Sequence, residues 1–121
     1  MEWACTVKRK YFDAIKDGRK KYEIRKKVPC LKEGDVLFIC CENDVIKCEV
    51  VFLLKVGKVK AWSLYKYEMC IDCIAYNNYV QEINEVNLIR LRRKESVVGE
   101  QLKEFRSKVV RSPQWFCKIK Y

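Results

Sequence analysis

The chain has 121 residues, 50% of them hydrophobic, with 26 basic and 16 acidic side chains, no histidine and a formal charge of +10. This length supports one hydrophobic core and excludes two, and this hydrophobic content excludes a disordered chain, so we expect one folded domain over residues 1–121. The absence of histidine removes the usual acid/base group of neutral pH, so any catalysis would have to use Lys, Glu, Tyr or Cys.

The excess of positive charge indicates which kind of partner the protein binds. On a small domain it favours a polyanion, with nucleic acid ahead of an anionic membrane surface. The lysine-rich composition of a biased genome or of a thermophile would give the same excess of basic residues. Residues 1–7 lack the charged and apolar regions of a signal peptide, and the longest apolar run, residues 50–54, has the length of a strand. We therefore expect a soluble, cytoplasmic protein with no membrane partner.

The hydrophobic pattern predicts strands interspersed with short helices. In chain order, we expect a strand over residues 2–8, a helix over about 9–17, strands over about 20–27, 36–41 and 45–55, an imperfect helix over about 61–75, a strand over 86–91 and a helix over 99–108. The same pattern marks a bend or bulge at Gly57, a helix break at Asn77 and Asn78, and a closing strand with Trp115, Phe116 and Ile119.

Strands arranged around hairpins, with an early helix and one or two short ones, indicate an α+β domain with about five to six strands. A small sheet of this kind commonly closes on itself, because closure removes the exposed strand edges. We therefore expect a small β-barrel.

The early helix ends in a glycine turn. Tyr11, Phe12 and Ile15 recur at spacings of three and four, which places them on one helical face. Gly18 then ends the helix, since glycine readily adopts the left-handed backbone that a helix C-terminus commonly needs.

After the turn the sequence alternates with a period of two, which places Glu23 and Arg25 on one face of a strand, with Lys20 close by at the turn. One interpretation is a surface ion pair on a solvated strand. The other is the polar floor of a cleft, where Lys20 and Arg25 hold an anionic or carbonyl ligand and Glu23 orients them or accepts a hydrogen bond from a base. The periodicity leaves both open.

This helix-turn-strand segment resembles the opening of an ASCH domain, a branch of the PUA-like superfamily. The positions that carry the resemblance are Lys8, Tyr11, Gly18, Lys20, Glu23, Arg25, Gly34 and Asp35. Residues 112–116 also resemble a Pro-Gln-x-Phe element that closes many members, whereas residues 55–85 match only loosely.

The resemblance implies a PUA-like β-barrel with a cleft beside the Gly-x-Lys-x-x-Glu-x-Arg strand, and a partner that is RNA or a modified nucleotide. The binding residues that it implies are Lys8, Tyr11, Lys20, Glu23, Arg25 and Trp115. We expect no cofactor and no metal.

Two features allow either a nucleic-acid role or a plain structural one. Tyr11 and Trp115 can stack on a base or pack in the core. A basic run over residues 90–94, together with residues 8–10, can follow a phosphate backbone or simply form a solvated face.

An enzymatic alternative also follows from the resemblance. Some similar small proteins are amidohydrolases that deacetylate N4-acetylcytidine with a lysine, a threonine and a downstream glutamate. Here Lys20 is kept, Glu23 stands where the threonine would be, and Glu68 is the candidate downstream carboxylate. Lys20 and Glu23 are thus the candidate catalytic residues, and metal-independent RNA cleavage is a further alternative.

The eight cysteines need a separate interpretation. Cys70 and Cys73 have the spacing of half a zinc site or of a redox pair, but no histidine or suitably spaced second pair completes such a site. Cys40 and Cys41 are adjacent, so they point to opposite faces of a strand. We therefore expect most of the cysteines to pack as small hydrophobic side chains.

Overall fold

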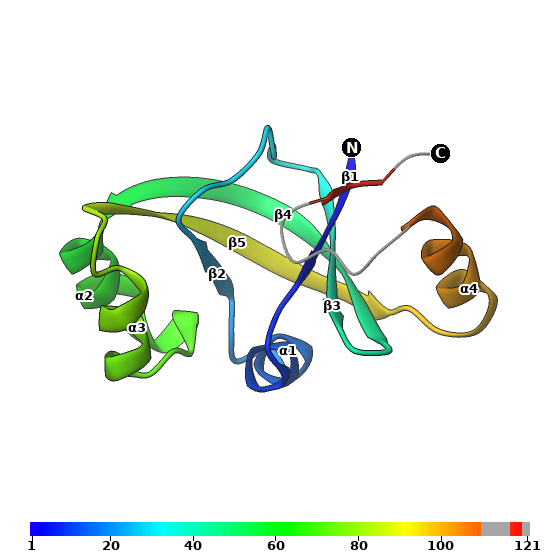
Figure 1. Ribbon diagram of the computed structural model, residues 1–121, viewed down its shortest axis with the longest axis horizontal. Coiled ribbons are helices and arrows are strands. Elements are labelled where there is room, and N and C mark those ends of the chain that lie inside the picture. The colour runs from blue at the N-terminus through cyan, green and yellow to red at the C-terminus, as the bar shows by residue number, and fades with distance from the viewer. Residues whose placement is uncertain (110–116, 120–121) are drawn as a thin grey trace.

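The computed structural model describes residues 1–109 and 117–119. Figure 1 shows a twisted sheet with helices at its two ends and one helix below it. The elements in chain order are β1 (Glu2–Thr6), α1 (Arg9–Lys16), β2 (Tyr22–Arg25), β3 (Val36–Cys41), β4 (Asp44–Gly57), α2 (Lys58–Met69), α3 (Cys73–Tyr79), β5 (Glu85–Ser96), α4 (Gly99–Lys108) and β6 (Cys117–Lys118).

The sheet has six strands in the order β2-β5-β4-β3-β1-β6. The β1–β3 pair is parallel, and the other neighbouring pairs are antiparallel. The long strands β4 and β5 form a ribbon that runs through the molecule (Figure 1). Its register shifts between Lys47 and Cys48 and again between Val50 and Phe52. Such irregularities bend and twist a ribbon, and they lie here rather than at Gly57, which directly precedes α2.

The expectation of a closed barrel is wrong. β2 and β6 lie at opposite ends of the strand order, so the sheet is open. β2 is four residues long and pairs with β5 along one edge. Towards β1 the contact is made by a side chain, because Arg25 Nη2 donates to the carbonyl of Thr6 over 3.1 Å. A guanidinium therefore spans the gap that backbone pairing would close in a barrel.

The helices cover separate parts of the core. Phe12 of α1 packs with the sheet residues Leu37 and Ile39 in one buried cluster. A second cluster lies under α2 and α3, and a third lies under α4, where Phe105 packs with Val45. The α+β class is confirmed, and the predicted bounds of residues 36–41 and 99–108 agree with β3 and α4.

The segment after β4 forms two helices instead of one. Cys70 takes a left-handed conformation with φ 49°, which ends α2. Asp72 then caps α3 by accepting a hydrogen bond from the Ala75 backbone N–H at 2.9 Å. Asn77 and Asn78 lie inside α3, so the predicted break there is wrong. None of the helices within the described ranges is long and apolar enough to cross a membrane.

Two expectations near the C-terminus have different outcomes. The strand predicted over 86–91 continues to Ser96, because its basic run stays paired with β4. Ile119 is buried beside β6, whereas Trp115 and Phe116 lie outside the residues that the structure describes.

The cysteines divide by burial, and the seven whose side chains the structure describes are free thiols. Cys40 and Cys41 belong to different core clusters, as their alternation predicted. Burial raises the pKa of Cys48 to about 12, so this thiol stays protonated and packs as a hydrophobic side chain. The four buried positions are Cys5, Cys40, Cys41 and Cys48; Cys70 is half-buried, and Cys30 and Cys73 are exposed.

The Gly-Asp element of the family pattern is a structural clamp. Gly34 has φ 89°, which favours glycine, and its N–H donates to the Val50 carbonyl at 2.8 Å. The Asp35 carboxylate accepts from the Trp3 indole at 3.0 Å and from the Lys32 N–H at 2.9 Å. Burial raises the pKa of Asp35, but these hydrogen bonds outweigh it and leave the pKa below its usual value.

We expect Asp35→Asn to lower the free energy of unfolding by about 1–2 kcal/mol at neutral pH, because charge-assisted hydrogen bonds become neutral ones. A carboxylate with a lowered folded-state pKa stabilises the fold above its unfolded pKa of about 3.9 and loses that effect as pH falls through the folded value. Urea unfolding at pH 7 and near pH 3 should therefore show the difference between wild type and variant shrinking in acid.

The neighbouring exposed residue provides the control for this measurement. Glu33→Gln removes the same charge from the same turn and should change stability by less than about 0.5 kcal/mol. Equal effects of the two substitutions would contradict the clamp.

Candidate functional site

A pocket of about 250 Å³ lies between the end of β1, the start of α1, the strand β2 and the helix α3. It is lined by Thr6, Val7, Lys8, Tyr11, Lys20, Glu23, Ile24, Arg25, Ile71, Ala75 and Tyr79. The structure thus brings together every residue predicted for the binding site except Trp115, which lies outside the described ranges.

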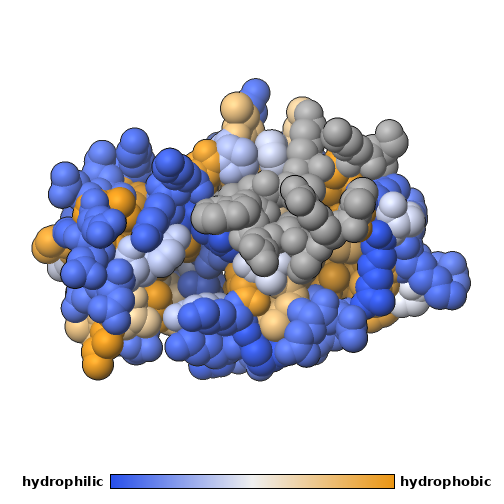
Figure 2. Space-filling model, viewed as in Figure 1, coloured by the Kyte–Doolittle hydropathy of each residue, from blue (hydrophilic) through white to orange (hydrophobic). Residues whose placement is uncertain are grey.

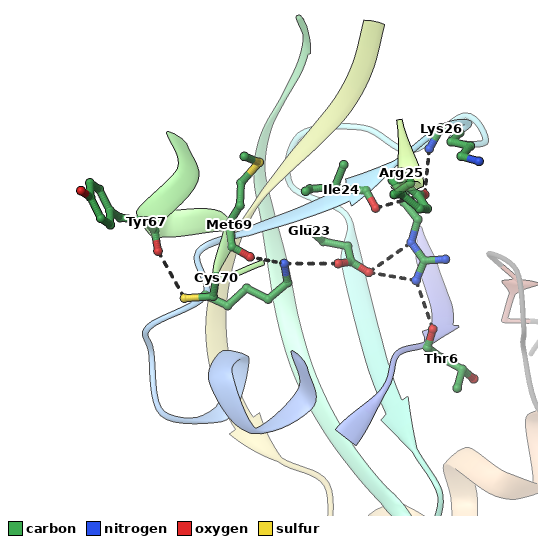
Figure 3. A network of polar contacts seen from close by, with 10 residues as sticks. Thr6, Glu23, Ile24, Arg25, Lys26, Tyr67, Met69 and Cys70 are labelled. Atoms are coloured by element: carbon green, nitrogen blue, oxygen red, sulfur yellow. Dashed lines mark hydrogen bonds and ion pairs between the residues drawn. The ribbon is translucent and has the colours of Figure 1, made fainter. Parts of the chain in front are cut away.

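Glu23 is the central charged group of this pocket. Its side chain is buried, and its Oε2 accepts from Arg25 Nε at 3.1 Å and lies 2.9 Å from Arg25 Nη2 (Figure 3). Its Oε1 lies 3.7 Å from Lys20 Nζ. Both carboxylate oxygens therefore face cations of the same chain.

Lys20 is also buried, with 4% of its surface exposed. Its Nζ donates to the carbonyl of Met69 at 2.5 Å, at the end of α2, where helix carbonyls lack a partner within the helix. The same Nζ lies 5.1 Å from the centre of the Tyr11 ring. Burial lowers the pKa of Lys20, although the Glu23 carboxylate opposes this shift.

The local sequence explains why these charges converge. Gly18 has φ 87° and turns the chain from α1 towards β2. In β2, Tyr22 and Ile24 point into the core beneath α2 and α3. Since side chains alternate along a strand, Glu23 and Arg25 point to the opposite face. Lys8, at the start of α1, adds a further cation, so positive charge exceeds the single carboxylate in the pocket.

The helix α3 contributes residues that the sequence analysis missed. Ile71, Ala75 and Tyr79 line the pocket, and Tyr79 Oη accepts from the Lys26 N–H at 3.1 Å. They fall in the segment that matches the family only loosely. Recognising Asp72 as a helix cap would have placed Ala75 and Tyr79, four residues apart, on one helical face.

The structure separates other predicted groups from the pocket. The Glu68 carboxylate pairs with Arg90 at 3.2 Å and is not among the pocket residues. The basic run lines a second groove of about 420 Å³ instead. Its cationic residues are Lys20, Lys21, Arg90, Arg92 and Arg93. Lys20 thus lines both the pocket and the second groove.

Acidic groups partly offset the other basic residues near α1. Arg9 pairs with Asp44 at 3.0 Å, and Lys10 lies 3.8 Å from Asp72. On the face seen in Figure 2, hydrophilic residues cover the lower edge of the molecule, where α1 lies. Within the described ranges, no cluster of three or more His, Cys, Asp or Glu is placed to hold a metal ion.

The fold and this pocket define a small α+β domain with a positively charged pocket at the open side of its sheet. The chain belongs to the ASCH domain family, whose pattern it matches over residues 6–108. The match includes the Lys20, Glu23 and Arg25 motif and ends before Trp115.

Solved structures share this fold. An ASCH protein from Zymomonas mobilis superposes with a TM-score of 0.83 at 21% identity, covering 98% of this chain and 87% of that one. A serine-to-alanine variant of the same protein gives a TM-score of 0.82 at 21% identity, covering 98% and 88%. A Pyrococcus furiosus protein solved by NMR gives 0.55 at 19% identity, covering 77% and 97%. No protein of curated function matches the chain in sequence.

We expect Glu23→Ala to lower the free energy of unfolding by about 3 kcal/mol, because it leaves Lys20 and Arg25 without their shared buried counter-charge. Lys20→Met should cost about 1 kcal/mol or less, since it removes a buried charge and keeps the length of the side chain. Denaturant unfolding at neutral pH measures both.

An exposed glutamate is the control for Glu23. Glu104 pairs with Lys108 at 2.8 Å on the surface of α4, and Glu104→Ala should cost less than about 1 kcal/mol. A similar loss for Glu23→Ala and Glu104→Ala would mean that the pocket carboxylate does not organise its neighbours.

Proposed function

We propose that the pocket binds a base or nucleotide of RNA. The observation that carries this proposal is the convergence of Lys8, Lys20 and Arg25 on one pocket whose single carboxylate, Glu23, is already engaged by two of them. The charge presented to a ligand is therefore positive, which suits phosphate and carbonyl oxygens.

The size and lining of the pocket support a nucleotide. A volume of about 250 Å³ lies just below the roughly 300–1,000 Å³ typical of sites for drug-sized molecules, so it suits a single base. Tyr11 and Tyr79 line the pocket and provide aromatic rings for stacking. Tyr11 packs against the core and is half-buried at the pocket, so its ring can also meet a ligand there.

The second groove favours an oligonucleotide over a free nucleoside as the ligand. It shares Lys20 with the pocket and adds the cations Lys21, Arg90, Arg92 and Arg93, and the whole chain carries a charge of +10. Lys21 and Arg93 form no ion pair with any residue in the described ranges. Such cations attract phosphates through long-range charge, which salt screens.

A second candidate is an amidohydrolase that acts on a modified nucleoside such as N4-acetylcytidine. The lowered pKa of Lys20 favours it, because a buried lysine that loses its proton readily can act as a base. The position of Glu68 weighs against it, since that carboxylate pairs with Arg90 away from the pocket.

Binding of a labelled twelve-nucleotide RNA, followed by fluorescence anisotropy, tests the first proposal. We expect Lys20→Met to weaken binding about tenfold or more, because it removes a charge-assisted hydrogen bond. Affinity should also fall steeply as salt rises.

Lys103→Met is the matched control for that loss, because Lys103 is exposed on α4 and far from the pocket lining. It removes the same charge and should change affinity less than about twofold. Equal losses for the two variants would place the binding outside the pocket.

Incubation with N4-acetylcytidine, with the product identified by mass spectrometry, tests the second candidate. Only the neutral form of Lys20 can act as a base, so the rate should rise with pH and level off below the ordinary lysine pKa of about 10.4. Lys20→Arg keeps the charge but cannot lose its proton, and should abolish product while RNA binding persists. Product formation by Lys20→Arg would exclude Lys20 as the base.

A further inference from the structure

The second groove forms where the pairing between β2 and β5 ends. The first residue of β2, Tyr22, pairs with Arg90, and the Leu91 N–H extends this pairing by donating to the Lys21 carbonyl at 2.9 Å. Before Lys21 the chain turns away through Gly18 towards α1, whereas β5 runs on to its end without β2 beside it. The groove of about 420 Å³ is lined by residues from both sides of this step in the sheet.

A β-bulge in β4 also shapes the groove. Val50 pairs with Leu91 and Phe52 pairs with Arg90, so Val51 between them has no partner in the register. Val51 and Phe52 both line the groove. Bulges bend a strand and re-aim its side chains, and they are common beside active sites. The groove is thus built by a local feature of the backbone as well as by charged side chains.

Two of the cations that line the groove are already engaged by the chain. Arg90 pairs with Glu68 at 3.2 Å, and its guanidinium carbon lies 5.2 Å from the centre of the Tyr22 ring. Arg92 pairs with Glu49 at 3.0 Å. A phosphate that approached either arginine would have to compete with a carboxylate that is held beside it.

The other two exposed cations of the groove are Lys21 and Arg93, which form no ion pair with any described residue. Lys21 lies opposite Leu91 in the ladder, and residues two apart on a strand share a face. Lys21 and Arg93 are therefore diagonal neighbours on one face, about 7–8 Å apart. Leu91 packs in the same buried cluster as Ile15 of α1, so this is the face that α1 covers.

The pocket and the second groove lie along one face of α1. Tyr11 lines the pocket, and Ile15, four residues further on, lines the groove. At a rise of 1.5 Å per residue these two positions are about 6 Å apart along the helix axis. The phosphates of a stacked strand recur about every 3.4 Å, so neighbouring nucleotides of one strand can reach both places.

We infer that Lys21 and Arg93 form a second subsite, which binds backbone phosphates of the RNA strand whose nucleotide occupies the pocket, and that Arg90 and Arg92 take no part in it. The inference rests on the proposed function, and it adds direct contacts with the backbone to the long-range attraction of the groove. Exposed cations without a carboxylate beside them suit phosphate oxygens, because no ion pair of the chain has to break.

The salt dependence of RNA binding tests this assignment, with the same labelled twelve-nucleotide RNA and the full chain. Each phosphate neutralised on a single strand contributes about 0.7 to the slope of log affinity against log salt concentration. We expect Arg93→Gln and Lys21→Gln each to reduce this slope by about 0.7 and to weaken binding about fivefold at low salt.

Arg92→Gln is the matched control. It makes the same substitution at the adjacent residue of β5, in the same groove and with the same loss of charge, but Arg92 is engaged by Glu49. It should change the affinity less than about twofold and leave the slope unchanged. Lys21, Arg92 and Arg93 are exposed, so all three variants should unfold at the denaturant concentration of the wild type.

The conservative variant Arg93→Lys gives a second readout. It keeps the positive charge, so it should retain the slope of the wild type. A slope as low as that of Arg93→Gln would mean that neutralisation of a phosphate is not what Arg93 supplies, and would overturn its place in the subsite.

The possible results separate this inference from the proposed function. Binding that Lys20→Met weakens, but that Arg92→Gln and Arg93→Gln weaken equally, would overturn the subsite alone. A wild-type slope in Arg93→Gln or Lys21→Gln would also overturn it. A loss with Arg93→Gln but none with Lys20→Met would place the RNA in the groove without the pocket, and would overturn the proposed function and the link between the two. No binding of the RNA by the wild-type chain would overturn both.

Discussion

The buried Glu23 carboxylate is the group on which the open side of this fold depends. It holds Lys20 and Arg25 in place, and each of these cations reaches a different element. Lys20 reaches the end of α2 through the Met69 carbonyl, and Arg25 reaches β1 through the Thr6 carbonyl. One carboxylate thereby fixes a helix and two strands that share no backbone ladder. Because the chain forms this network by itself, a ligand of the proposed kind would meet a pre-organised positive pocket, which lowers the cost of ordering on binding.

The same arrangement explains why an internal ion network does not neutralise the site. A buried charge is tolerated when it is paired and hydrogen-bonded, and here one anion serves two cations. Lys8 then adds charge at the rim. The second groove extends the positive surface along β5, partly offset by the Glu68 and Glu49 carboxylates. Under the proposed function, electrostatic attraction would act over a wide surface, and base recognition would be confined to the small pocket.

The sequence predicted the individual helices and strands better than it predicted whether the sheet closes into a barrel. The strand over residues 36–41 and the helix over 99–108 were readable because their periodicity and flanking turns agree. Barrel closure depends on whether β2 pairs with β1, and periodicity carries no information about that. Cys70 ends α2 in the left-handed conformation that glycine usually adopts. Because the sequence has no glycine there to signal a helix end, one helix was predicted where two exist. The site residues of the Gly-x-Lys-x-x-Glu-x-Arg motif could be foreseen because a glycine turn and a strand fix their relative positions, whereas Tyr79 comes from the loosely matched segment.

The hydroxyl of Tyr79 has a consequence for how copies of this protein behave towards each other. A short strand at the end of a sheet offers unpaired backbone groups to any other extended chain, and such edges promote aggregation. Tyr79 engages the Lys26 N–H and faces the Ile24 carbonyl along that edge of β2. It thereby occupies two of the backbone groups that a foreign strand would need to continue the ladder there. The residue that forms one wall of the pocket thus also covers part of the edge at which another chain could pair with β2.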